Sequence, residues 1–200
     1  MRIATISDNA FWVVTTQRAR DNSRIPDTSE DDWIQYAIES AHDYFERTLG
    51  CCIATTQFRA KLDQFPRNRA SIELPVWPIA EVTRLAYLDS EGNEQDIPLE
   101  QIVQPVDQGR YAIRLANHAR FPEAKRTPNA VTIDFTAGWP EPAAVPKTLT
   151  RAALMLISHW YENREAVLVG TASKEIEIGT SVLLEHLRPD EDMTAAEVEE

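Results

Sequence analysis

The sequence predicts an α+β protein: two long packed helices, a small antiparallel β-sheet or open barrel inserted between them, and an extended C-terminal arm. Two periodicities indicate this class. Apolar residues recur with the 3.6-residue period of a helix in residues 28–50 and 146–164, and they alternate with the period of a strand within residues 53–136. We therefore expect one domain over residues 1–188, followed by an acidic disordered tail over residues 189–200.

The first fifty residues contain the clearest helix. Residues 1–27 show no clean period, although residues 10–19 are compatible with a short helix that ends before Asp21. Residues 28–32 then supply N-cap side chains and three acids, which suit the start of a helix. Gly50 is expected to end this helix. Its apolar stripe consists of Trp33, Ile34, Ala37, Ile38, Ala41, Tyr44, Phe45 and Leu49.

Residues 53–136 are expected to form five or six antiparallel strands. Alternating apolar residues mark strands at residues 54–62, 111–115 and 131–135, and turn-forming Pro, Asp, Asn and Gly residues separate the runs. The helical period returns at Pro146, which suits the first position of a helix. Because both helices carry an apolar stripe, the second including Leu149, Leu156, Ile157 and Trp160, we expect them to pack together.

Composition limits the kind of protein this can be. The chain is large enough to bury a core without disulfide or metal support, and its two cysteines, Cys51 and Cys52, are neighbours without a zinc-ligand spacing. We interpret them as buried or half-buried thiols in a reducing compartment. Residues 1–10 lack the apolar core of a signal peptide and no stretch approaches eighteen apolar residues, so we expect neither export nor contact with a membrane.

The net charge of −12 argues against a nucleic-acid ligand, because binding to phosphates usually requires a basic face. Seven of these negative charges are carried by the last fifty residues. Two local basic clusters remain, at residues 59–69 and 110–126. They are open to three interpretations: solvated strand edges, nucleic-acid contacts, or contacts with acidic residues such as 27–32 of a neighbouring subunit.

Common catalytic motifs are missing from the sequence. Gly-rich phosphate loops, the HExxH zinc motif and the GxSxG elbow do not occur, and the four histidines have no ligand spacing. We expect no cofactor, no metal and no enzymatic activity. Asp107 followed by Glu123 and Lys125 weakly resembles the Asp and Glu-x-Lys of divalent-metal nucleases, but Pro122 precedes the Glu where a strand should hold it. A divalent-metal-dependent nuclease that uses Asp107 and Glu123 is nevertheless kept as an alternative.

The order of several segments resembles the head-tail connector, or adaptor, proteins of long-tailed phages and of gene transfer agents descended from phages. The similarity spans residues 28–188. Its segments are Ser29-Glu30-Asp31-Asp32-Trp33-Ile34 with Ala37-Ile38-Glu39-Ser40-Ala41, Leu74-Pro75-Val76-Trp77-Pro78 leading to Asp89-Ser90-Glu91-Gly92, Val131-Thr132-Ile133-Asp134-Phe135 with Gly138-Trp139, residues 152–165, and Ser181-Val182-Leu183-Leu184-Glu185-His186-Leu187-Arg188.

The resemblance implies a ring, commonly of twelve copies, seated below the portal protein and above the stopper or tail-completion proteins that receive the tail. DNA would pass through the ring without specific binding, since an acidic lining repels phosphates. Such a subunit would reside in the cytoplasm of a bacterial host during assembly and then in the particle neck. A protein-binding regulatory module is a third class that the residues leave open.

The resemblance also suggests contact residues. The arm, residues 165–188, has apolar anchors too sparse to fold alone, so we expect it to bind the portal through Ile176, Ile178, Val182, Leu183, Leu184 and Leu187. The alternative is that it covers the helix pair of its own subunit. The candidate subunit contacts are Asp31, Asp32, Arg110, Arg114 and Arg120. Because neither helix leaves a long apolar face unused, we expect the free chain to be monomeric or weakly associated.

Overall fold

The computed structural model describes residues 1–8, 11–66, 71–103, 112–116 and 119–163. These residues form three α-helices and two antiparallel sheets, which confirms the α+β class. They divide into two compact units. The described parts of residues 1–10 and 54–140 form a β unit, and those of residues 11–53 and 141–163 form a helical unit. The single domain over residues 1–188 stays a prediction.

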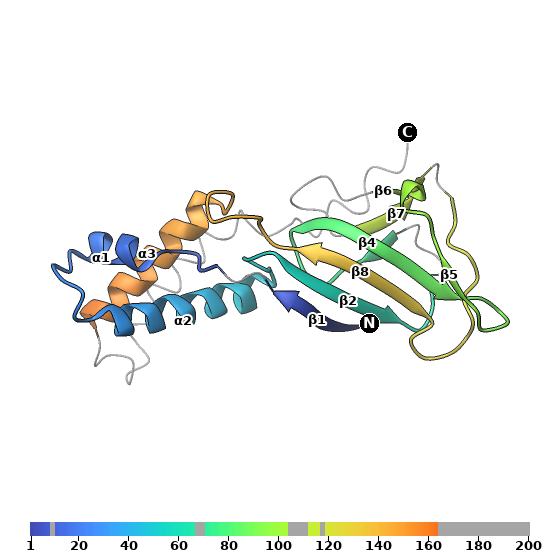
Figure 1. Ribbon diagram of the computed structural model, residues 1–200, viewed down its shortest axis with the longest axis horizontal. Coiled ribbons are helices and arrows are strands. Elements are labelled where there is room, and N and C mark those ends of the chain that lie inside the picture. Colours follow the sequence, from blue (N-terminus) through green and yellow to red (C-terminus); the bar gives the residue numbers. More distant parts are fainter. Residues whose placement is uncertain (9–10, 67–70, 104–111, 117–118, 164–200) are drawn as a thin grey trace. The chain divides into compact units, whose positions relative to one another are not determined.

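The larger sheet of the β unit has five strands in the order β1-β2-β8-β4-β5, and every neighbouring pair is antiparallel (Figure 1). Its strands are β1 (Arg2–Asp8), β2 (Thr56–Leu62), β8 (Val131–Ala137), β4 (Ile79–Leu88) and β5 (Glu94–Asp96). β1 was not expected from the sequence. The residues of β2 that pair with it lie 48 to 59 positions further along the chain, so no local pattern reports the pairing.

The β unit also contains a second sheet, of three strands, where the sequence predicted only one small sheet or open barrel. It has the order β3-β7-β6, with β3 (Ser71–Glu73), β7 (Ala112–Leu115) and β6 (Ile102–Val103), and a 3-10 turn, η1 (Leu99–Gln101), precedes β6. These strands are only two to four residues long. Short strands carry little alternation, which is why the sequence predicted fewer strands than the seven found between residues 56 and 137.

The core of the β unit follows the predicted alternation. On β8 the side chains of Val131, Ile133, Phe135 and Ala137 are buried, while the three between them are half-buried. Ile72, Ile113 and Leu115 add buried side chains from the smaller sheet. Gly138, directly after β8, has a φ of 100°, and a Cβ there would fall 2.3 Å from the carbonyl oxygen of Ala54. Only glycine permits this close approach of two backbone segments.

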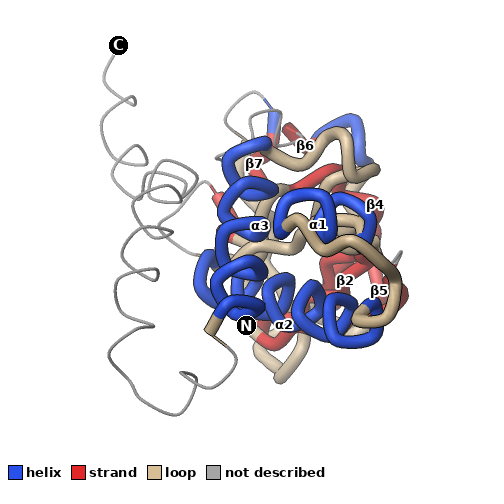
Figure 2. The backbone as a smooth tube through the Cα atoms, turned by 90° about the vertical axis from the view of Figure 1, so that its left-hand side faces the viewer, coloured by secondary structure: helices blue, strands red, loops and turns tan. Residues whose placement is uncertain are grey.

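The helical unit contains α1 (Thr16–Ser23), α2 (Asp31–Leu49) and α3 (Lys147–Glu162), which lie together in Figure 2. α2 and α3 pack against each other, as their apolar stripes predicted. Ile34, Ile38 and Phe45 of α2 are buried, as are Leu149 and Ile157 of α3. Trp33 and Trp160, expected in the same stripes, are half-buried. In the described part of the chain, no helix combines the length and the apolar character needed to cross a membrane.

Helix boundaries differ from the prediction where side chains make specific contacts. α1 begins at residue 16 rather than 10, because the Thr15 side chain caps it by accepting from the Arg18 N–H at 3.3 Å. It continues through residues 21–23, where Asn22 and Ser23 hydrogen-bond to Ser158 of α3, both at 2.8 Å. α2 begins at residue 31, since Ser29 bonds to Asp27 in the preceding turn instead of capping the helix. Gly50 ends α2 with a φ of 64°.

Candidate assembly site

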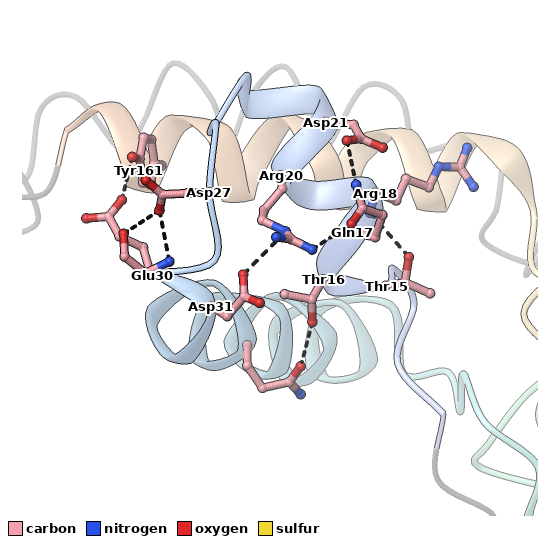
Figure 3. Close-up of polar contacts among 12 residues, drawn as sticks. Thr15, Thr16, Gln17, Arg18, Arg20, Asp21, Asp27, Glu30, Asp31 and Tyr161 are labelled. Atoms are coloured by element: carbon pink, nitrogen blue, oxygen red, sulfur yellow. Dashed lines mark hydrogen bonds and ion pairs between the residues drawn. The ribbon is translucent and has the colours of Figure 1, made fainter.

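The acidic start of α2 is joined to α1 by polar contacts (Figure 3). Asp31, a predicted subunit contact, forms an ion pair with Arg20 at 3.3 Å, and the Arg20 side chain is 16% exposed. Thr16 of α1 donates to Gln35 of α2 at 3.1 Å. Asp32, the second predicted contact, is exposed. Of the two acids, Asp32 is therefore the one with its carboxylate available to another molecule.

The same end of the helical unit is also connected to α3. Tyr161 donates its hydroxyl proton to Glu30 (Figure 3). Its ring also makes an edge-to-face contact with Trp33 at a centroid distance of 5.5 Å. In the loop before α2, the side chain and backbone of Ser29 donate to Asp27 and lower the pKa of that carboxyl. Together these contacts hold the acidic loop in place, so it presents its remaining charges from a defined backbone.

Near the C-terminal end of α2, the half-buried Glu46 lies in a cluster with the buried residues His42, Cys51 and Cys52. Glu46 lies 3.4 Å from the His42 Nε2 and accepts from the Ile53 N–H at 2.7 Å. Burial acts to raise the pKa of Glu46, but the hydrogen bonds from His42, Ile53 and Cys52 outweigh it, and the pKa is lowered. Burial, reinforced by the Glu46 charge, raises the pKa of Cys51 to about 12. Both thiols are buried, and that of Cys51 stays protonated at neutral pH.

One face of the large sheet carries ion pairs at Arg59 and Arg84. Arg59 of β2 forms a bidentate ion pair with Asp134 of β8: its Nε and Nη2 donate to the two carboxylate oxygens at 2.7 and 2.8 Å. This pairing raises the pKa of Arg59. Arg84 of β4 contacts both Asp96 at 2.8 Å and Glu94 at 3.1 Å. The first predicted basic cluster is thus partly neutralised within the chain, because Arg59 is paired.

The second basic cluster is only partly described. Arg114 lies on β7, half-buried and opposite Ser71 of β3. Arg120 is exposed in the irregular segment between β7 and β8. Arg110 lies outside the described residues, as do all six predicted portal contacts, Ile176, Ile178, Val182, Leu183, Leu184 and Leu187. The structure therefore does not bring the candidate subunit contacts together into one site.

The nuclease alternative gains no geometric support. Glu123 is exposed in an irregular segment rather than on a strand, and Asp107 lies outside the described residues. Among the residues that the structure describes, no three His, Cys, Asp or Glu side chains are grouped so as to hold a metal ion.

The two edges of the five-stranded sheet are candidate contact surfaces that were not predicted from the sequence. β1 forms one edge, with exposed Ile3 and Ile6, and β5 forms the other, with exposed Glu94 and Asp96. The run of β-branched residues Ile3, Thr5 and Ile6 was the available signal for a strand.

Several solved structures share the fold of this chain. No family model and no curated protein matches the chain. A chain from the neck of an empty GTA particle, computed with C6 symmetry, matches with a TM-score of 0.72 and 24% identity over 94% of this chain and 95% of that chain. A chain from the virion of a native gene transfer agent (GTA) particle matches with a TM-score of 0.71 and 22% identity over the same shares.

A chain from the neck of a native GTA particle, computed with C12 symmetry, matches with a TM-score of 0.62, 24% identity and the same coverage. The α+β fold of this chain is thus shared, over nearly its whole length, with chains of gene transfer agent particles.

Proposed function

We propose that this chain is a structural head-tail connector, or adaptor, subunit in the neck of a phage-like particle. One observation carries the proposal: the fold matches a chain of a GTA neck with a TM-score of 0.72 over 94% of this chain and 95% of the other. The alignment spans both chains almost completely, so the likeness extends to the combination of helical unit and β unit rather than to one common module. The proposed role is structural, without catalysis or cofactor.

The proposed assembly is a ring of twelve identical copies. The matching neck structures were computed with C6 and with C12 symmetry, and a ring of twelve copies is compatible with both. Identical subunits in a ring need two different, mutually complementary surfaces. Exposed side chains of both signs, such as Asp32 in the helical unit and Arg120 in the β unit, are consistent with that requirement.

The proposed partners are the portal protein on one side of the ring and a stopper or tail-completion protein on the other. Residues 176–187 would contact the portal, and DNA would pass through the ring unbound. The net charge of −12 supports passage without adhesion, since like charges oppose contact with phosphates. The subunit would occupy the cytoplasm of the producing bacterium during assembly and the neck of the finished particle.

Co-assembly with the portal protein encoded in the same gene cluster tests this proposal. The expected result is co-sedimentation of the two proteins and, in negative-stain images, a second ring with twelvefold symmetry stacked on the portal. The same preparation is incubated with supercoiled plasmid and Mg²⁺. Absence of a stacked ring contradicts the connector role, and Mg²⁺-dependent nicking that is lost in Glu123→Gln would favour the nuclease instead.

A further inference from the structure

Both outer strands of the five-stranded sheet have an open edge in the described part of the chain. β1 pairs with β2 on one side only, and β5 pairs with β4 on one side only (Figure 1). An edge strand presents unpaired N–H and C=O groups and readily pairs with a strand of another chain. These two edges are therefore the surfaces of the β unit best suited to strand addition.

β1 is unusually exposed for a strand with apolar residues. All of residues 1–7 are exposed, and the relative exposures of Met1, Ile3 and Ile6 are 57%, 41% and 50%. Ile3 lies opposite Ala60, which is fully buried, so Ile3 is on the core-facing side of the sheet yet is not covered. Solvent exposure of apolar side chains beside an open edge is typical of a strand that pairs with a partner.

The charge on the β1 edge is unbalanced. Arg2 of β1 is directly opposite Lys61 of β2, and neither side chain has an ion-pair partner among the described residues. Like charges placed opposite each other on neighbouring strands destabilise the pair. An acidic side chain from another molecule would relieve this repulsion.

The β5 edge carries the complementary charge. Glu94, Gln95 and Asp96 are all exposed, and both carboxylates share the single guanidinium of Arg84, which leaves a net negative charge. The carbonyl oxygen of Asn93 accepts from the Asp89 N–H at 2.9 Å, and the N–H of Ile97 donates to the Leu85 carbonyl oxygen at 2.8 Å. The backbone groups of both residues therefore point toward β4. By the alternation of a strand, the backbone N–H and C=O groups of Glu94 and Asp96 point to the open side.

We propose that β1 of one copy adds to β5 of the next copy, so that the five-stranded sheets of neighbouring subunits are continuous. This inference rests on the proposed ring and names its subunit interface. The basic pair Arg2 and Lys61 meets the acidic pair Glu94 and Asp96, and Ile3 and Ile6 are covered by the neighbour. The occupant of the β1 edge is thus a second copy of this chain.

The topology allows this pairing to repeat. Four successive antiparallel pairings make β1 and β5 run parallel to each other, so a β5–β1 junction between copies is a parallel strand pair. The two edges differ, so the contact is head-to-tail, and a head-to-tail contact with the right rotation closes into a ring. β5 has only three residues. So short a junction yields few hydrogen bonds, in keeping with weak association of the free chain and ring closure on a template.

Cysteine crosslinking of the full chain tests the interface. Thr5, opposite Phe58, and Gln95, opposite Tyr87, lie on the same face of the sheet at the two edges. The double variant Thr5→Cys with Gln95→Cys is treated at high concentration with a short bismaleimide, which tolerates small differences in register. We expect a ladder of covalent oligomers. Each single variant should give no ladder, and Thr5→Cys paired with Asp43→Cys on the exposed face of α2 is the matched control.

The outcomes separate the interface from the ring itself. A ladder in the double variant alone supports the β5–β1 junction, whereas dimers from Thr5→Cys alone indicate symmetric β1–β1 pairing and overturn it. A carbodiimide, which joins any lysine to any nearby carboxylate, is applied to the unmodified chain in parallel. Carbodiimide oligomers without a cysteine ladder overturn this interface but leave the proposed ring intact. Failure of both crosslinkers contradicts this interface in the free chain, whereas the proposed ring is tested separately by co-assembly with the portal protein.

A charge reversal gives an independent readout. Arg2→Glu places a carboxylate opposite Lys61 within the chain, so the subunit itself should remain folded, but it sets like charge against Glu94 and Asp96 of the neighbour. Introduced into the double-cysteine variant, it should reduce the ladder at least about threefold at low salt, and Arg2→Lys should not. An unchanged ladder in Arg2→Glu contradicts the electrostatic part of the interface.

Discussion

Substitution of Ile157 by Asp tests the packing of α2 against α3. Ile157 is 1% exposed on α3, in the face that meets α2, whereas Met155, two residues earlier on the same helix, is 42% exposed. Truncation of a buried isoleucine to alanine costs about 2–5 kcal/mol. Aspartate at the same place should cost at least as much, because it buries a charge without a partner. Met155→Asp should stay within about 0.5 kcal/mol.

The assay is urea and thermal unfolding followed by far-UV circular dichroism. For a chain of this length, a loss of about 3 kcal/mol lowers Tm by roughly 6–12 °C. We therefore expect a large decrease in Tm for Ile157→Asp, a smaller one for Ile157→Ala and almost none for Met155→Asp. Equal unfolding of Ile157→Asp and Met155→Asp would refute the assignment of Ile157 to the core.

Four further predictions concern Gly138, Glu46, Cys51 and the C-terminal residues. Gly138→Ala should lower the free energy of unfolding by at least about 2 kcal/mol, because the added Cβ would lie 2.3 Å from the backbone oxygen of Ala54. Gly92→Ala should lower it by about 1 kcal/mol, because the added Cβ meets only the end of the flexible Lys125 side chain. The urea midpoints of the two variants test this difference. The pKa of Glu46 is lower in the folded chain than in the unfolded one, so its ionised carboxylate stabilises the fold at neutral pH and this contribution is lost as the pH falls through the folded pKa. The urea midpoint of Glu46→Gln should therefore fall less between about pH 6 and pH 3 than that of the unsubstituted chain. An identical decrease in both proteins would exclude this role. Cys51, with a pKa of about 12, should react with iodoacetamide at neutral pH only after unfolding, and rapid alkylation of the native chain would contradict its burial. Deletion of residues 174–200 should leave Tm unchanged while abolishing attachment to portal-bearing heads; an insoluble or much less stable truncated chain would show that the segment belongs to the core.

The proposed role as a ring subunit in a particle neck connects these measurements to function. A ring subunit needs a stable interior and two complementary surfaces, and the two requirements are tested separately. The substitutions at Ile157 and Gly138 measure the interior, and the crosslinks at Thr5 and Gln95 measure the surfaces. A variant that keeps its Tm and loses the ladder therefore reports on assembly and not on folding.

Local periodicity predicted those helices and strands in which apolar residues recur at regular intervals along the element. The helix of residues 31–49 and the strands of residues 56–62 and 131–137 were predicted because one face of each is buried or half-buried along its length. The helix of residues 16–23 was placed too early because its last residues, including Asn22 and Ser23, favour turns locally. In the folded chain both make hydrogen bonds to Ser158, which lies 136 and 135 residues away, and they are helical.

The amino-acid sequence by itself determined the α+β class, the two long amphipathic helices and the absence of familiar catalytic motifs, because each depends on residue type and short-range spacing. The tertiary structure decided which charges are already paired within the chain, as for Asp31 with Arg20 and Arg59 with Asp134. It also decided that residues 2–8 form an edge strand and that β5 forms the opposite edge. Strand pairing joins residues far apart in the chain, so the free edges of a sheet, and the charges that face each other across it, exist only once the sheet has formed.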